Sequence, residues 1–189
     1  MQKKIYAGLM ILSVILVSIL IMIIPTFFTN GISRISLNKE INLPLILNDT
    51  KDIKLVFFGY SGCSDICTPR LYSISEVYND LDKESQKRVG VEFLDISVPS
   101  DYTLPSRFAQ YFNPDFKGIF LNEKVLREYT RAFDVYFSQS LSDAMEYDHT
   151  ANLYLVKKTN NTKELRYVYS SYPYDLQQIN LDIKELLNE

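Results

Sequence analysis

The sequence is poor in the residues that bind soft metals or cross-link a small fold. Its 189 residues include two cysteines, Cys63 and Cys67, a single histidine, His149, and no tryptophan. Two cysteines are too few for a scaffold held by disulfides, so burial of apolar side chains must hold the fold together. Thiol chemistry in this chain therefore depends on one closely spaced pair.

Positive charge is also scarce. Residues 35–189 carry 17 of the 20 basic side chains and all 23 acidic ones, a net charge of −6. A nucleic-acid surface needs a basic patch, and none is visible, so no nucleic-acid partner is expected. This stretch has the length of one domain, which buries roughly 68–70% of its unfolded surface.

Charge is absent altogether from Ile5 to Phe28, a run of 24 nearly all apolar residues that follows Lys3 and Lys4. As a helix it would extend roughly 36 Å, enough to cross a hydrocarbon core of about 30 Å. A cleaved signal peptide is the alternative, but its apolar region is normally about 7–15 residues long. We therefore expect residues 1–34 to be a retained membrane anchor with short flanks.

The lysines before the apolar run favour an N-terminus in the cytoplasm. Residues 35–189 would then form a domain outside the cytoplasm, where disulfides persist. The prediction is a single-pass protein of the bacterial cytoplasmic (inner) membrane, with its soluble domain on the periplasmic side.

Strand and helix patterns alternate along the domain. Buried strands are expected at Lys54–Tyr60 and Val89–Ile96, because both are apolar runs of strand length. Thr68 and Pro69 are expected to be the N-cap and first residue of a helix that continues to Asp82. The other expected elements are extended segments at Ile35–Leu47 and Val135–Phe137, helices at Leu104–Phe112, Glu123–Phe133 and Asp175–Leu187, and strands at Gly118–Leu121, Leu153–Val156 and Leu165–Tyr169, the last two joined by a turn at Asn160-Asn161.

Repeated strand–helix units predict a mainly parallel sheet covered on both faces, and the terminal hairpin adds an antiparallel part. The cysteine pair follows the first buried strand directly and stands at the start of a helix. That placement is the thioredoxin arrangement. The predicted fold is therefore α/β and thioredoxin-like, with a central mixed sheet flanked by helices and one transmembrane helix before it.

The spacing of Cys63 and Cys67 is C-x-x-x-C. In a helix their Cα atoms would lie about 6.2 Å apart, within the disulfide range of about 4.4–6.8 Å. The pair can close a disulfide, hold a soft metal ion, or serve as an inert staple, although so small a loop stabilises little. Free N–H groups at a helix N-terminus favour the thiolate, which both attacks disulfides and binds metals.

His149 lies in the segment YDHTA, just before the strand Leu153–Val156. A lone histidine beside a strand is more often a hydrogen-bonded structural residue than a ligand. In a thioredoxin-like domain, however, this position lies opposite the cysteine motif. Asp148 is expected to face solvent, because adjacent residues of a strand point to opposite faces.

These segments resemble the Sco/SenC family. FFGYSGCSDIC is similar to the family's F-F-G-Y-T-x-C-P-D-x-C stretch, and YDHTANLYLV to its D-H-S/T-A-x-x-Y-L-V/I stretch. FAQYFNPDFKGIF and FDVYFS match two segments between them, so the resemblance covers roughly residues 40–187. In the family's D-P-x-R-D-T-P loop, which corresponds to residues 97–103, only Asp101 matches.

The resemblance implies a thioredoxin-like domain that binds one copper ion through Cys63, Cys67 and His149. Two thiolates and one imidazole are a soft donor set suited to Cu(I). The first hypothesis is a copper chaperone that serves the dinuclear copper site of cytochrome c oxidase subunit II or another copper protein, together with other copper carriers. The second is a thiol-disulfide oxidoreductase, in which Cys63 attacks and Cys67 resolves the mixed disulfide.

Overall fold

The protein is described by a computed structural model that covers residues 6, 10–19, 34–43, 50–97, 101–141, 146–159 and 162–189. The chain divides into two compact units, Met1–Ser33 and Arg34–Glu189. In the first unit, residues 10–19 are helical. No helix within the described ranges is both long and apolar enough to cross a membrane. Of the 24 residues of the predicted span from Ile5 to Phe28, 13 lie outside these ranges.

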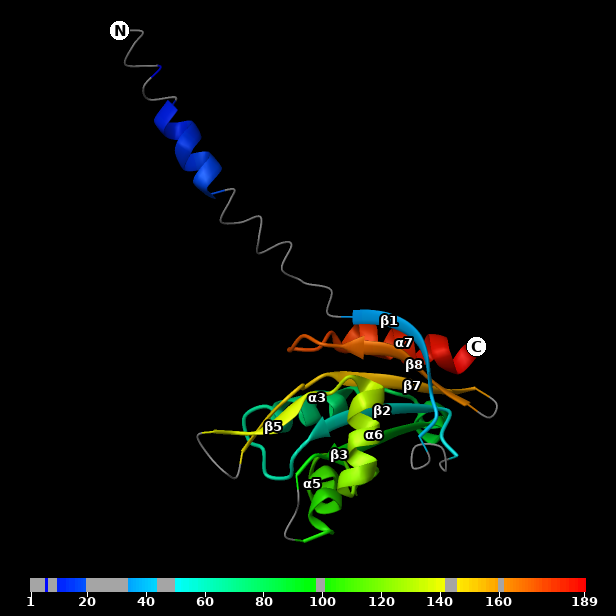
Figure 1. Cartoon of the computed structure of the whole chain (residues 1–189). Helices are drawn as coiled ribbons and strands as arrows, with labels where there is room; N and C mark the ends of the chain where they lie inside the picture. Colours follow the sequence, from blue (N-terminus) through cyan, green and yellow to red (C-terminus); the bar gives the residue numbers. More distant parts are fainter. Residues whose placement is uncertain are drawn as a thin grey trace. The chain divides into compact units, whose positions relative to one another are not determined.

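The second unit is built on a six-stranded mixed sheet with the strand order β1-β8-β7-β2-β3-β4 (Figure 1). Neighbouring strands are parallel in the β2-β3-β4 half and antiparallel from β1 through β8 and β7 to β2. The predicted mixed sheet is therefore confirmed, but the expectation that it is mainly parallel is wrong, because three of its five strand pairings are antiparallel. Its strands are β1 (Arg34–Ile41), β2 (Ile53–Gly59), β3 (Val89–Asp95), β4 (Lys117–Phe120), β7 (Leu153–Thr159) and β8 (Thr162–Tyr169).

Helices cover both faces of this sheet. On one face, side chains from α3, α5 and α7 pack against Leu55 and Phe57 of β2. On the other face, α6 packs against Val56 and Phe58 (Figure 1). All seven residues of β2 are buried, as expected for a strand with a core on each side. The helices are α3 (Cys67–Asn79), α4 (Lys83–Arg88), α5 (Leu104–Phe112), α6 (Glu123–Phe133) and α7 (Leu176–Asn188).

A separate two-stranded ribbon precedes β7. It consists of β5 (Phe137–Gln139) and β6 (Tyr147–His149), and Phe137 pairs with His149. The expected extended segment from Val135 therefore begins as a strand only at Phe137. Pairing across this ribbon fixes the backbone of the single histidine.

The start of α3 differs from the sequence prediction. The N-cap is Ile66 and the helix begins at Cys67, so the predicted N-cap at Thr68 is wrong. The hydroxyl of Thr68 instead donates a hydrogen bond to the carbonyl of Cys63 at 2.8 Å. Pro69 is tolerated because the first N–H groups of a helix have no partner within the helix.

The same region contains a helix that the periodicity does not predict. α3 ends at Asn79 rather than at Asp82, and α4 follows. Asp82 caps α4, because its carboxylate accepts from the N–H groups of Glu84 and Ser85, each at 3.0 Å. α4 has no buried residue, so no apolar pattern marks it in the sequence.

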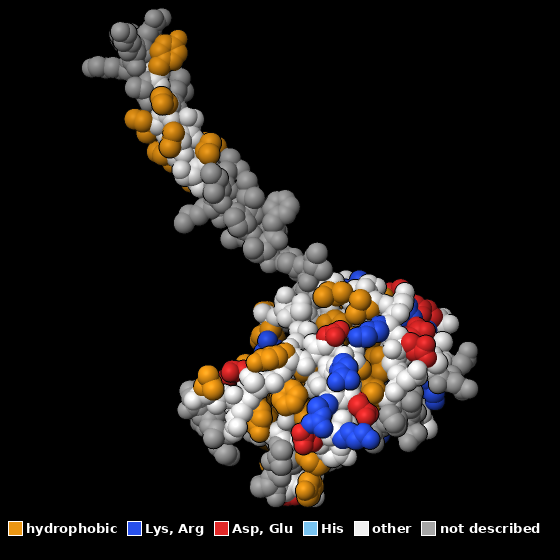
Figure 2. Space-filling view, in the orientation of Figure 1, with side chains coloured by type: hydrophobic (Ala, Val, Ile, Leu, Met, Phe, Trp, Pro, Cys, Tyr) orange, Lys and Arg blue, Asp and Glu red, His pale blue; other side chains and the backbone are white. Residues whose placement is uncertain are grey.

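The predicted C-terminal hairpin is confirmed by the pairing of Thr159 with Thr162. The turn predicted between them, Asn160-Asn161, lies outside the described residues, as does the part of the first extended segment from residue 44 to 47. On the face drawn in Figure 2, blue and red side chains are interspersed over α6.

Candidate metal centre

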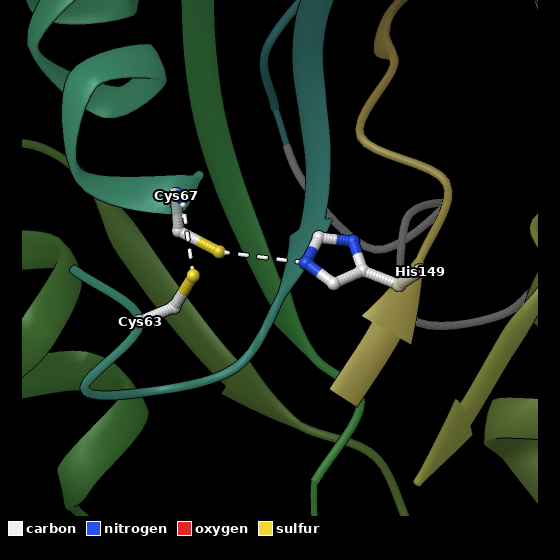
Figure 3. Close-up of side chains that lie close together, drawn as sticks. All are labelled: Cys63, Cys67 and His149. Carbon is white, nitrogen blue, oxygen red and sulfur yellow. Dashed lines mark hydrogen bonds between the residues drawn. The ribbon is translucent and has the colours of Figure 1, made fainter. Parts of the chain in front are cut away.

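The structure brings Cys63, Cys67 and His149 together (Figure 3). Cys63 lies in the turn after β2, Cys67 is the first residue of α3, and His149 is the last residue of β6. The two sulfurs and a ring nitrogen all lie within 4.8 Å of one another. The fold thus brings residue 149 next to a pair more than 80 positions earlier in the sequence.

The cysteine pair occupies an irregular turn that leads into the helix. Gly62 has a φ of 95°, a left-handed conformation that favours glycine over any other residue. The backbone N–H of Cys67 donates to Cys63 Sγ at 3.3 Å (Figure 3). Both thiols are buried and free in this structure. The turn thus holds two reduced sulfurs on the same side of the chain.

Gly59, at the end of β2, makes room for the second sulfur. A Cβ built on this glycine would lie 2.6 Å from Cys67 Sγ and 3.0 Å from the ring of Phe93. Real Cβ atoms essentially never approach another atom as closely as 2.6 Å. Cys67 therefore packs against bare backbone, and any side chain at position 59 would displace its sulfur.

His149 presents one nitrogen to the cysteines. Its Nδ1 lies 3.1 Å from the carbonyl oxygen of Thr150, which can only accept, so Nδ1 carries the proton. Nε2 is left with its lone pair and lies 3.7 Å from Cys67 Sγ (Figure 3). In metal-binding histidines, the ring nitrogen that does not face the metal usually donates a hydrogen bond to a carbonyl or carboxylate, and this bond orients the ring. Asp148 is exposed, as predicted.

The pKa values of the two thiols are shifted in opposite directions. Hydrogen bonding from Cys67, through its thiol and its backbone N–H, outweighs burial and lowers the pKa of Cys63 to about 3. The same interaction, together with burial, raises the pKa of Cys67 far above its usual value. The metal-free pair therefore holds one proton, with the thiolate at Cys63. Burial and the neighbouring Cys63 also raise the pKa of Tyr60.

The arrangement fits a metal ion of soft character. An ion with a sulfur at about 2.3 Å and a nitrogen at about 2.1 Å, bound at a trigonal angle, keeps these donors about 3.8 Å apart. The observed separation of Cys67 Sγ and His149 Nε2 is 3.7 Å. Two sulfurs and one imidazole nitrogen match the preference of Cu(I).

One residue that supports this site is not among those predicted from the sequence pattern. Asp95 is the last residue of β3, and its side chain is fully buried. One carboxylate oxygen accepts from the N–H of Ser61 at 3.0 Å and from its hydroxyl at 2.5 Å. The other accepts from the N–H and hydroxyl of Ser97 at 2.8 and 2.6 Å. Asp95 therefore ties the turn that carries Cys63 to the end of β3.

A signal for Asp95 was present in the sequence. An acidic residue within an apolar strand is almost never buried without a partner. Two serines, at positions 61 and 97, follow the ends of adjacent parallel strands. Asp101, the position at which the loop matches the family pattern, is exposed instead and accepts from Thr103 and Arg107.

Comparison with known proteins agrees with these features. The SCO1/SenC family model matches residues 50–187. The chain belongs to the SCO1/SenC family. The SCO2-like protein RC0895 of Rickettsia conorii is 26% identical over 133 residues, which make up 67% of this chain and 63% of that relative. The SCO2 homolog of Danio rerio is 30% identical over 107 residues, 54% of this chain and 38% of the relative.

Solved structures share the fold. Apo Sco1 from Thermus thermophilus has a TM-score of 0.64 at 25% identity, over 81% of this chain and 92% of that one. Arabidopsis thaliana ScoI, solved with copper bound, has a TM-score of 0.64 at 16% identity, over 82% and 99%. The thioredoxin-like fold of the Sco family is therefore shown. The matched part of this chain spans less than two thirds of the Rickettsia relative's length.

The low pKa of Cys63 predicts thiol reactivity in acid. At pH 5 a group with a pKa of about 3 is ionised, whereas an ordinary cysteine with a pKa of about 8.5 is not. In reduced, metal-free protein, iodoacetamide at pH 5 should label Cys63 and leave Cys67 unlabelled, as read by peptide mass mapping. Replacing Cys67 by alanine removes the main cause and should slow the labelling. Labelling of Cys63 that begins only near pH 8 would contradict the assignment.

The role of Asp95 predicts a second effect on the same reaction. Asp95→Ala should loosen the turn and raise the pKa of Cys63 by about one unit, so that the pH profile of its labelling moves upward by that amount. Ser61→Ala, which keeps the carboxylate and removes one hydroxyl, should move the profile less. Asp101→Ala removes an exposed aspartate and is the matched control. The same pH profile in Asp95→Ala and wild type, with circular dichroism showing both folded, would exclude the positioning role.

Proposed function

We propose that this protein is a membrane-anchored copper chaperone that delivers copper to the dinuclear copper site of cytochrome c oxidase subunit II. The observation that carries the proposal is the convergence of two thiol sulfurs and an imidazole nitrogen within 4.8 Å. Membership of the SCO1/SenC family supports it. So do the structures of Arabidopsis thaliana and yeast Sco proteins with copper bound, which share the fold.

Copper is the cargo in this proposal, and Cys63, Cys67 and His149 are its ligands. Cys63 offers a thiolate and His149 a free Nε2, so neither has to lose a proton. Cys67 must give up its proton to coordinate, because only the thiolate binds strongly. Binding should therefore weaken as the pH falls. Release to a client requires an acceptor group that displaces these donors one by one.

The exposed helix at residues 10–19 supports the proposed anchor. Eight of its apolar side chains are between 51% and 71% exposed, and they appear in orange on this segment in Figure 2. Exposed apolar side chains of this density are unfavourable in water and favourable in lipid. We place the apolar run Ile5–Phe28, which includes this helix, in the bacterial cytoplasmic membrane as a single pass, and the domain on the periplasmic side. Other copper carriers would load the domain there.

A thiol-disulfide oxidoreductase is the second candidate. The observation that favours it is the asymmetry of the pair, with a thiolate at Cys63 and a buried thiol at Cys67. Cys63 would attack a client disulfide, and Cys67 would then resolve the mixed disulfide and release a reduced client. His149 distinguishes the candidates, because dithiol reduction has no need of a nitrogen donor beside the sulfurs.

The copper proposal predicts one Cu(I) per reduced domain. Cys63→Ala and Cys67→Ala should each remove most of the binding, because only one thiolate remains. His149→Ala should weaken binding by roughly tenfold, about 1.4 kcal/mol, because both thiolates remain. A titration against a competing chelator measures this. Glu185→Gln, on the exposed side of α7, is the control.

X-ray absorption of the copper-loaded wild type gives the deciding result. The proposal requires a nitrogen donor next to two sulfurs. If His149→Ala binds copper as tightly as wild type and the spectrum shows sulfur alone, the three-ligand site is wrong and the reductase becomes the favoured function.

The anchor predicts that the chain stays intact in the membrane. Intact-mass analysis of detergent-extracted protein should give the mass of the whole chain from Met1, because the apolar run is longer than a signal peptide requires. A variant beginning at Arg34 should be recovered in the soluble fraction. A mature N-terminus near residue 30 would show that the segment is a signal peptide.

A further inference from the structure

A cavity of about 350 Å³ opens beside the metal centre. Its lining includes Cys63, the rings of Tyr60 and Tyr147, and the side chains of Asp65, Glu146 and Asp148. The two tyrosine rings lie 5.5 Å apart, and Tyr60 also meets the ring of His149 edge-on at 6.0 Å. We call this cavity the acidic mouth.

The acidic mouth joins two distant parts of the chain. Asp65 stands in the turn between the cysteines, whereas Glu146 and Asp148 belong to the segment that ends in His149. Cys63 is only 3% exposed, yet it lines this cavity. A group that reacts with Cys63 therefore has a path to it through the mouth.

The charge of the mouth is uncompensated. Asp65, Glu146 and Asp148 are all exposed, and none forms an ion pair within the part of the chain that the structure describes. No described lysine or arginine lines the cavity. Arg70 is engaged elsewhere, since it donates to the carbonyl of Ile66 at 3.2 Å and stacks on the ring of Tyr172.

Several carboxylates elsewhere on the domain are in ion pairs. Asp182 meets Arg34, Glu189 meets Lys157 and Arg166, and Asp52 meets Arg88. Three carboxylates of one charge around a reactive sulfur repel one another, and the described residues offer them no ion pair; Asp65 accepts only from the hydroxyl of Ser64 at 2.6 Å. They are suited to a partner, because complementary charge steers association and selects the correct partner.

We propose that the acidic mouth docks a protein surface that carries lysine or arginine side chains around the sulfur or nitrogen group that exchanges with Cys63. The inference rests on the proposed function, because it names the kind of partner that reaches the same site. The rings of Tyr60 and Tyr147 cover one side of the approach to Cys63. The three carboxylates at the rim of the mouth bind the partner's lysine or arginine side chains.

The size of the effect follows from Coulomb's law. A carboxylate about 10 Å from the reacting sulfur changes the local concentration of a singly charged reagent by about twofold in water of low salt. Three carboxylates and a doubly charged reagent therefore give a factor of at least ten. At 1 M salt the screening length is about 3 Å, and the selection disappears.

Thiol-disulfide exchange with small charged disulfides tests this without copper. Cys63 thiolate attacks one sulfur of the reagent and expels a thiolate; Cys67 then attacks Cys63, expels the second thiolate and closes the protein disulfide. Cystamine, with two positive charges, and dithiodiglycolate, with two negative charges, are the probes. Rates are measured on the reduced full chain in detergent at low and high salt.

Each reagent is compared between variants, so that its intrinsic reactivity cancels. The rim variant should slow cystamine by at least tenfold, speed dithiodiglycolate, and lose its difference from wild type at 1 M salt. The rim variant is Asp65→Asn with Glu146→Gln and Asp148→Asn. The control variant makes the same change in net charge at exposed carboxylates away from the mouth, with Glu76→Gln, Glu128→Gln and Glu185→Gln.

Equal effects in the rim and control variants would overturn the inference, because net charge alone would then explain them. So would rates that do not change with the rim charges. If the triple variant fails to fold, the three single substitutions decide, each with an expected slowing of cystamine of about twofold or more. If the rim charges select the reagents but the protein does not bind copper, the docking inference holds and the chaperone proposal fails. If the protein binds copper but the rim charges select nothing, the chaperone proposal holds and the docking inference fails.

Discussion

The candidate metal centre depends on how closely the end of β2 packs against the first turn of α3. A side chain on Gly59 would meet Cys67 Sγ at 2.6 Å, so the sulfur occupies space that only a glycine leaves open. β2 is buried along its whole length, with one core on each face. The position of the cysteine turn therefore depends on a strand that is buried along its whole length, and hydrogen bonds from Ser61 to Asp95 hold the same turn to the end of β3.

Charge is distributed around this site in two opposite ways. Inside, hydrogen bonds from Cys67 and its backbone N–H stabilise a thiolate at Cys63. Outside, the carboxylates of the acidic mouth surround the path to that thiolate. The inner arrangement makes the sulfur a strong donor to metal and a nucleophile toward disulfides. The outer one controls which molecules can approach it, so reactivity and selectivity reside in different residues.

The sequence alone determined most of the secondary structure and the identity of the three candidate ligands. Buried strands such as β2 and β3 are visible because a strand covered on both faces is an uninterrupted apolar run. Spacing shows that Cys63 and Cys67 can meet, because residues four apart share one side of a turn or helix. Reasoning from neighbouring residues gave a wrong N-cap for α3, because the hydroxyl of Thr68 donates to the carbonyl of Cys63 instead of capping the helix. It also missed α4, which buries no residue.

Tertiary structure decided everything that depends on residues distant in the chain. His149 reaches the cysteines only because β6 pairs with β5 and places Nε2 3.7 Å from Cys67 Sγ. Burial of Asp95 and the gathering of three carboxylates at the mouth arise in the same way. Sequence patterns report the burial and spacing of neighbouring residues, which short-range geometry controls. Distances between separate segments are set by how sheets and helices pack, and no local pattern contains them.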